Sequence, residues 1–346
     1  MTREQFRPPG HDSDHFLLTT VVGSFPQPDW LDRVRTLADE DEEFSAAAAH
    51  DDACRLTIYE FERMGLDVVT DGEMRRGDMV EYFTNFIDGY QASDGDDSGW
   101  NAQMPTVVDE VTTAEPWLVD DFEFAASVAE KPVKTTVTGP FTLASFASPG
   151  PYNSVPSLAT DFAELVAVEA ERLADAGARY IQIDEPGLGM TPHGGLATEC
   201  LSEIDARVPS DVRLSVHVCS GNYTNLVPDL FEFPVDEIDL EFASDDADDP
   251  AVIFDGVDLN VDVAFGVVDS SSKTVESVPE IRENIEYALS IVPPERLTVT
   301  TDCGTKPLPR DVAASKVTNM VSAAREVEAQ LDEGTLVPEN LDPAEF

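Results

Sequence analysis

The feature that most constrains the fold is a unit that recurs along the chain. Each unit is a short run rich in β-branched residues, then a polar or glycine-rich stop, then a stretch with helical periodicity. Eight such runs occur, at residues 17–25, 66–73, 133–140, 180–186, 213–219, 237–243, 263–269 and 296–304. Most of them are nearly continuous apolar runs, as expected of parallel strands that are buried on both faces.

Eight strands that alternate with helices predict an α/β fold, a (β/α)8 TIM barrel in a single domain. A doubly wound sheet is the alternative, but no glycine-rich dinucleotide fingerprint follows the first run. We expect an N-terminal extension at residues 1–16, the catalytic barrel at 17–330 and a C-terminal tail at 331–346. The acidic, tryptophan-containing segment at about 91–130 breaks the rhythm, and we expect it to form a surface excursion or hairpin over the barrel mouth.

The charge of the chain limits its partners. The formal net charge is -48, with 69 acidic residues against 21 basic ones. Phosphate binding needs clustered positive charge, so we predict no nucleic-acid partner. The acidic residues are scattered among apolar segments, which favours a solvated acidic surface over a disordered tail. Such a surface is suited to molar salt, where the screening length falls to ~3 Å, and we therefore predict a halophilic protein.

Targeting signals and cysteine usage point to the cytoplasm. No run of about 18 apolar residues exists, and the N-terminus lacks the hydrophobic run of a signal peptide. We therefore predict a cytoplasmic protein with no membrane partner. Cys54 and Cys200 lie in helix-like segments and are interpreted as buried apolar residues. Cys219 and Cys303 instead lie at the ends of predicted strands.

Unusual polar residues gather where the predicted strands end. The catalytic groups of a barrel come from the C-terminal ends of its strands and from the loops that follow. The residues at these ends are Gly23-Ser24, Asp71-Gly72-Glu73, Asp184-Glu185, His217-Val218-Cys219, Glu241 and Asp302-Cys303-Gly304. We therefore expect the active site at this end of the barrel.

Four of these residues form a candidate metal site. His217 and Cys219 are two apart on a predicted strand, so both side chains project the same way. A thiolate with an imidazole favours zinc, although this pair alone is weak evidence. Glu241 and Cys303 complete a set of two thiolates, one imidazole and one carboxylate, which suits tetrahedral zinc. We predict one Zn²⁺ per chain.

Several motifs resemble a known family in order and over residues 17–328. They are VVGSFPQ (21–27), DGEMRRGDMVEYF (71–83), IQIDEPGL (181–188), HVC (217–219) and DCGTK (302–306). They resemble the catalytic C-terminal half of cobalamin-independent methionine synthase. The amino-terminal half of the longer enzymes of this family is missing, so the chain looks like the short, single-barrel form found among archaea.

The resemblance implies a zinc-dependent methyltransferase that places a methyl group on the thiol of homocysteine to form methionine. It implies that the four candidate ligands bind zinc. It also implies that Gly23, Ser24 and Glu73 hold the amino-acid group of homocysteine, and that Asp184 pairs with its ammonium. Glu73 and Asp184 are thus the predicted catalytic residues. For Asp184 and Glu185, the alternative interpretation is a helix N-cap after a strand.

The methyl donor is left open between two classes, a methylated folate or pterin and a methylcorrinoid, free or protein-bound. Segment 266–274 lacks the histidine that protonates the departing folate nitrogen in the folate-using enzymes. The tryptophan that follows the TGP motif in that family is also missing from residues 138–147. Two other functions stay open: an alkyltransferase acting on another small thiol, such as a sulfonate, and a non-catalytic zinc-binding barrel.

Overall fold

A computed structural model describes residues 17–343, apart from residues 41–44, 93–103, 114, 192, 220–222, 339–340 and 342. The predicted N-terminal extension, much of the loop in segment 91–130 and the last residues of the predicted tail lie outside the described residues. The chain forms two compact units. Among the described residues, the first holds Arg76–Glu123 and Thr136–Ile238, and the second holds the described parts of Arg7–Arg75, Phe124–Thr135 and Asp239–Phe346.

Seven parallel strands form one sheet in the order β1-β9-β8-β7-β6-β5-β4. From β4 to β9 each strand neighbours the next one along the chain, as in βαβ units whose helices return the chain to the same end. The first strand pairs with the last, and this order confirms the predicted barrel class. The strands are β1 (Leu18–Thr19), β4 (Thr135–Thr138), β5 (Tyr180–Asp184), β6 (Arg213–Val218), β7 (Glu237–Leu240), β8 (Asp262–Gly266) and β9 (Leu297–Thr300).

The second predicted run, residues 66–73, is not a regular strand, and the prediction was wrong in this respect. An isolated parallel bridge joins Val69 to Val133. Lys134 N donates to Val69 O at 2.8 Å, and Val68 N donates to Thr19 O at 3.2 Å. The segment therefore lies between β1 and residues 132–134, where an eighth strand is expected.

Local side-chain chemistry explains why this ladder is short. The Asp67 carboxylate accepts both the amide of Thr19 at 2.9 Å and its hydroxyl at 2.8 Å, so it competes with the backbone ladder. Gly72 and Glu73 then turn the chain with φ of 68° and 56°. A strand cannot continue through two residues in the left-handed region.

The first unit contains a hairpin and the helices that follow β4, β5 and β6. Helix α5 is capped by Ser154, whose hydroxyl accepts from Ser157 N. Leu158, Phe162 and Val166 recur at helical spacing on its buried face. Strand β2, which ends at Gln91, pairs antiparallel with β3, which lies within the segment predicted as an excursion. The elements are η1 (Glu81–Asn85), β2 (Asp88–Gln91), β3 (Thr106–Thr112), α4 (Pro140–Ser145), α5 (Val155–Asp175), α6 (Pro186–Met190), α7 (Gly194–Arg207), η2 (Tyr223–Asn225) and η3 (Asp229–Glu232). Helix α3 (Val119–Val128) begins in this unit, and its residues from Phe124 belong to the second.

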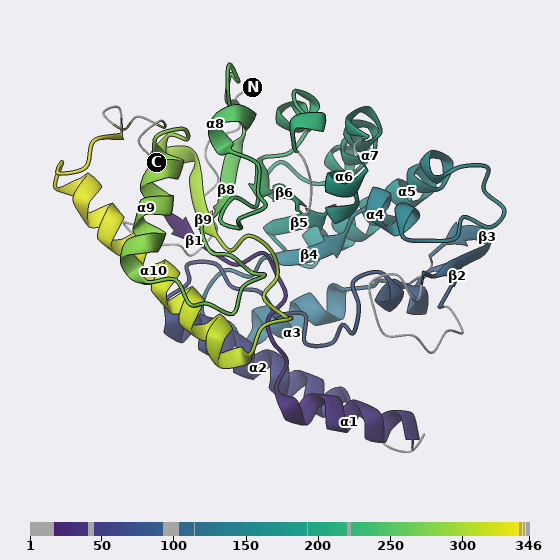
Figure 1. Cartoon of the computed structure of the whole chain (residues 1–346). Helices are drawn as coiled ribbons and strands as arrows, with labels where there is room; N and C mark the ends of the chain where they lie inside the picture. Colours follow the sequence, from purple (N-terminus) through teal and green to yellow (C-terminus); the bar gives the residue numbers. More distant parts are fainter. Residues whose placement is uncertain are drawn as a thin grey trace. The chain divides into compact units, whose positions relative to one another are not determined.

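The second unit contains the longest helix, α10, which packs beside α9 (Figure 1). Helix α9 begins with a capping box in which Ser277 and Glu280 each accept from the other's backbone amide. This box fixes the point where the loop after β8 becomes helix. The helices are α1 (Asp29–Glu40), α2 (Ala47–Met64), α8 (Pro250–Ile253), α9 (Val278–Leu289), η4 (Pro294–Arg296) and α10 (Arg310–Asp332).

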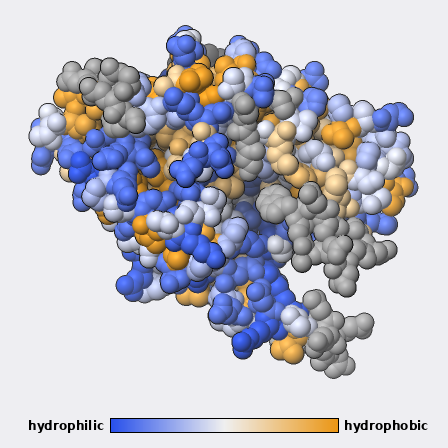
Figure 2. Space-filling model, viewed as in Figure 1, coloured by the Kyte–Doolittle hydropathy of each residue, from blue (hydrophilic) through white to orange (hydrophobic). Residues whose placement is uncertain are grey.

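In Figure 2 hydrophilic residues cover most of the visible face, and hydrophobic residues appear in scattered groups. None of the helices described by the structure is both long and apolar enough to cross a membrane. The halophilic interpretation of the acidic excess stays a prediction.

Candidate active site

Gly23 and Ser24 follow β1 in a loop that is held by the segment after Val69. Thr70 Oγ1 donates to Gly23 O at 2.7 Å. Phe25 N donates to Gly72 O at 3.1 Å. These two bonds flank Ser24, so its backbone is fixed on both sides. A fixed hydroxyl is what a site needs in order to bind a carboxylate with defined geometry.

Glu73 has an unusual backbone conformation. Among the described residues it is the only one other than glycine with positive φ, 56°. Its amide donates to Asp71 Oδ1 at 2.8 Å, which holds the turn. A left-handed conformation costs a residue with a Cβ of order 1 kcal/mol, and such residues concentrate at functional sites. The strain at Glu73 is consistent with the substrate-binding role that the sequence predicts.

The loop after β9 packs directly against Ser24. Thr305 N donates to Ser24 O at 2.9 Å. A Cβ placed on Gly304 would collide with Ser24 Oγ. Only glycine therefore fits between Cys303 and Thr305 while Ser24 keeps its position. The predicted ligand Cys303 and the predicted substrate residue Ser24 are thus held by one close backbone contact.

Two acidic residues end β5 and have different environments. Asp184 is 7% exposed, and its Oδ1 accepts from Gln182 Nε2 at 2.7 Å. Glu185 is 1% exposed and accepts from Phe141 N at 3.0 Å and from Thr142 N at 2.7 Å. Burial raises the pKa of Glu185 to about 7.

Glu185 caps a helix that is distant in sequence. None of its three bonds belongs to α6, the helix that follows it, whose N-terminus has no side-chain cap. Its partners are the first amides of α4, and a Cβ on Gly139 would collide with the Glu185 carboxyl group. The alternative interpretation of a helix N-cap therefore holds for Glu185, but at α4 instead of the helix that follows it.

His217 and Cys219 lie at the end of β6, beside Asp184. The register pairs Asp184 with His217, and Glu185 N donates to His217 O at 2.8 Å. His217 is 2% exposed and Cys219 is 3% exposed. Two buried residues two positions apart present their side chains to one side, as the sequence predicted.

Three groups in the described part of the chain could hold a metal ion together. The ligand atoms of His217, Cys219 and Cys303 all lie within 4.8 Å of one another. Two thiolates and an imidazole suit zinc, and three protein ligands leave the fourth position that a catalytic zinc keeps for substrate. The residues present therefore fit the metal that the sequence predicts. Glu241, the fourth predicted ligand, is not in this group.

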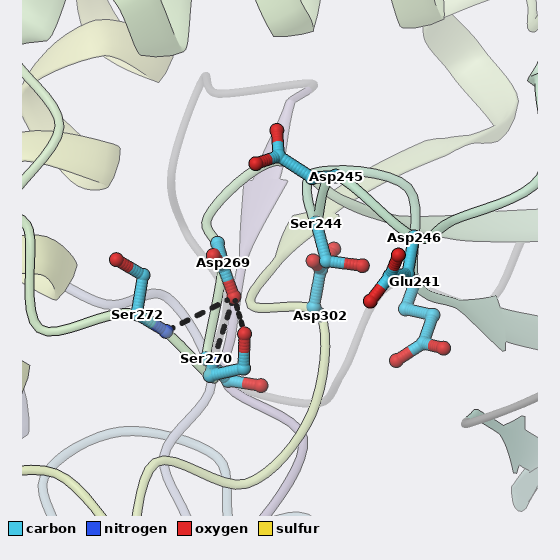
Figure 3. A pocket seen from close by; sticks show the side chains of 9 residues that line it. Glu241, Ser244, Asp245, Asp246, Asp269, Ser270, Ser272 and Asp302 are labelled. Atoms are coloured by element: carbon cyan, nitrogen blue, oxygen red, sulfur yellow. Dashed lines mark hydrogen bonds between the residues drawn. The ribbon is translucent and has the colours of Figure 1, made fainter.

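Glu241 instead lines a pocket of about 380 Å³ in the second unit. Figure 3 shows Glu241 and Asp246 on one side of the pocket, and Asp269 and Ser272 on the other. Asp302 also lines it and accepts from Phe242 N and Ala243 N at 2.9 Å. Burial raises the pKa of Asp302 to about 8. No individual role was predicted for Asp302 from the sequence, and its place next to Cys303 was the available signal.

Comparison with known proteins gives consistent results. The sequence model described as "Cobalamin-independent synthase, Catalytic domain" matches residues 17–326. A methionine synthase from Sulfurisphaera tokodaii is 35% identical over 326 residues, which cover 91% of this chain and 94% of that protein. A methionine synthase from Pyrococcus furiosus is also 35% identical, with the same coverage of 91% and 94%.

Solved structures agree on the fold. A B12-independent methionine synthase from Shewanella, bound to selenomethionine, has a TM-score of 0.80 and 26% identity, covering 92% of this chain and 99% of that one. A methyltransferase from Methanosarcina mazei has a TM-score of 0.60 at 13% identity, and shows a shared fold alone.

The parallel barrel, with its soft metal-binding group and its polar strand ends, defines a barrel enzyme of the methyltransferase class. The chain belongs to the cobalamin-independent methionine synthase family. The resemblance stated from the motifs is thereby confirmed. The roles of the individual site residues stay predictions.

Proposed function

We propose that the chain transfers a methyl group from a methylated folate or pterin to the thiol of homocysteine, forming methionine, with one zinc ion bound by His217, Cys219 and Cys303. The observation that carries the proposal is the grouping of these three ligand atoms within 4.8 Å. Family membership supports the reaction. The cobalamin-independent character of the family argues against the methylcorrinoid that the sequence left open.

The metal explains why a thiol reacts near neutral pH. A free thiol has a pKa of ~8.5, and the thiolate is the nucleophile. A zinc ion held by His217, Cys219 and Cys303 would lower the pKa of a coordinated thiol, so that the homocysteine sulfur would be available as a thiolate. The new S–C bond forms as the bond from the methyl carbon to the donor nitrogen breaks. That nitrogen keeps the electron pair and takes up one proton from solvent, which balances the proton that the thiol released. Glu241 is the fourth ligand that we propose for the state before homocysteine binds.

The chain's own residues orient the substrate. Ser24 and the amide of Gly23 donate to the homocysteine carboxylate, and Glu73 and Asp184 accept from its ammonium. Asp184 is suited to this role because Gln182 holds one of its oxygens while the residue is nearly buried. A fixed, desolvated carboxylate binds a cation more tightly than a solvated one. The reactive sulfur is then held at a defined place relative to Cys303.

An alkyltransferase for another small thiol is the second candidate. A sulfonate thiol has no ammonium, so it would leave Glu73 and Asp184 without a cation to bind. These two carboxylates therefore favour an amino-acid substrate. The cytoplasmic location is part of the same proposal.

The test is methionine formation by the purified, zinc-loaded protein in molar KCl. Homocysteine is supplied with 5-methyltetrahydrofolate or, in parallel, with methylcobalamin. Methionine from the folate alone supports the proposal. Methionine from methylcobalamin alone would overturn the proposed donor, and alkylation of a sulfonate thiol but not of homocysteine would overturn the proposed acceptor. Zinc binding without turnover of either acceptor would favour the non-catalytic alternative.

A further inference from the structure

The loop after β8 forms one wall of the pocket that Glu241 and Asp302 line. Its residues Asp269 to Ser272 all line this pocket (Figure 3). Asp269 Oδ1 accepts from Ser271 N and from Ser271 Oγ, both at 2.7 Å, and from Ser272 N at 3.3 Å. These bonds give the turn its shape, but they do not attach it to the rest of the unit.

Glu276 joins the two ends of this loop. Its Oε1 accepts from Asp269 N at 3.0 Å, seven residues earlier in the chain. Its own carbonyl accepts from Asn319 Nδ2 of α10 at 2.7 Å. Before Asp269 the backbone is held by β9, because Asp302 N donates to Val268 O at 2.9 Å. After Val268, the bond from Asp269 N to the Glu276 carboxylate holds the start of the turn.

A buried lysine on α10 fixes the Glu276 carboxylate. Lys316 Nζ lies 2.7 Å from Glu276 Oε2, and the lysine side chain is 0% exposed. In the part of the chain that the structure describes, Lys316 and Lys134 are the two lysines with fully buried side chains. A buried ammonium is stable only with a paired, hydrogen-bonded partner, so Lys316 and Glu276 hold each other in one geometry. The turn thereby acquires a rigid connection to α10.

We propose that Glu276, fixed by Lys316, is a positioning residue that holds the Asp269–Ser272 turn as a wall of the methyl-donor site. The inference rests on the proposed function. The pocket is also lined by the proposed ligand Glu241 and by Asp302, which is next to Cys303 in the chain. The residues assigned to homocysteine, namely Ser24, Glu73 and Asp184, are not among its lining residues. Loosening the turn therefore affects placement of the methyl donor and leaves homocysteine and the metal in place.

Two double variants isolate the contact between Glu276 and Asp269 N. Glu276→Ala with Lys316→Met and Glu276→Gln with Lys316→Met are both free of the buried charges. They differ in whether residue 276 can accept from Asp269 N. We expect the KM for 5-methyltetrahydrofolate to be about tenfold higher in the Ala variant than in the Gln variant. The KM for homocysteine and the zinc content are expected to match in the two.

Trypsin gives a readout that does not depend on turnover, because Lys273 lies within the loop. In the folded protein the Ala variant is expected to be cleaved after Lys273 several-fold faster than the Gln variant, since cleavage needs local opening. Glu283→Gln, at an exposed position on α9, controls for loss of a nearby negative charge and is expected to behave as the parent.

The positioning role would be overturned if the two double variants had equal KM values for 5-methyltetrahydrofolate. It would also be overturned if the Ala variant raised the KM for homocysteine as much as the KM for the donor. If the parent protein makes no methionine from 5-methyltetrahydrofolate, the proposed donor fails on its own. The trypsin comparison then decides whether Glu276 holds the turn: equal cleavage rates would show that it does not.

Discussion

Gly304 packs so closely on Ser24 that a Cβ at position 304 would overlap Ser24 Oγ and lie 3.3 Å from Ser24 Cβ. The neighbouring Thr305 amide donates to Ser24 O at 2.9 Å. A predicted zinc ligand, Cys303, and a predicted carboxylate-binding hydroxyl therefore share one rigid contact. Any change at Gly304 is expected to reach the substrate site through Ser24.

Gly304→Ala tests this coupling. The new methyl group would displace Ser24 Oγ, and loss of one hydrogen bond to a charged carboxylate raises the KM for homocysteine about tenfold. Ser24→Ala removes the same hydroxyl and is expected to have a similar effect. Both substitutions act through Ser24 Oγ. The KM for homocysteine of the double variant should therefore be only slightly higher than that of either single variant. Additive effects would show that Gly304 acts elsewhere. Gly195→Ala, where a Cβ meets nothing within 4 Å, is the matched control.

Zinc binding can be tested without turnover. We expect about one zinc per chain by metal analysis, and a large loss in Cys219→Ser and in Cys303→Ser, because a hydroxyl replaces a thiolate ligand. Cys200→Ser is the control, since Cys200 is buried on α7 and its thiol donates to Ala159 O. Full occupancy in the Cys219→Ser/Cys303→Ser double variant would contradict the ligand assignment.

Asp184→Asn tests the amino-acid substrate. The change keeps the shape of the side chain but removes the charge that pairs with the homocysteine ammonium. Loss of a charge-assisted contact costs ~1.5–3 kcal/mol, or roughly ten- to over a hundredfold in affinity. Binding of 4-mercaptobutyrate, which lacks the amino group, should be nearly unchanged, and so should the zinc content. If both thiols lose affinity equally, Asp184 has a structural role.

The acidic surface predicts salt-dependent stability. With a formal net charge of -48, self-repulsion destabilises the folded state in dilute buffer and is screened in molar salt. Thermal unfolding followed by circular dichroism should show Tm rising steeply between 0.1 and ~2 M KCl. A Tm that does not depend on salt would remove the halophilic interpretation.

The lowered pKa of His50 predicts that part of the folding stability is lost in acid. Burial, together with Arg35 and Arg75, lowers the pKa of His50 from 6.5 to about 4. As the pH falls, His50 is therefore protonated at a lower pH in the folded state than in the unfolded state. The stability that His50 contributes is complete above pH 6.5 and is lost as the pH falls toward 4. Urea unfolding of His50→Gln in molar KCl should show a weaker pH dependence than the parent in this window. Parallel curves would contradict the prediction.

Much of the fold could be predicted because its signal is local. Strands β5 and β6 are buried at every position, and their apolar runs are visible in the sequence. The polar residues that end these runs identify the active-site end of a barrel, since parallel strands in one sheet end on the same side. The sequence alone therefore determined the fold class, the family and the candidate ligands His217, Cys219 and Cys303.

Partners distant in sequence were decided by the tertiary structure. Glu185 caps α4, 44 positions away, and Lys316 pairs with Glu276, 40 positions away. The second predicted run lost its regular ladder because Asp67 binds Thr19 across 48 positions. Apolar periodicity indicates which face of an element is buried. It does not specify which buried polar group meets which, because each such pair depends on how separate elements pack.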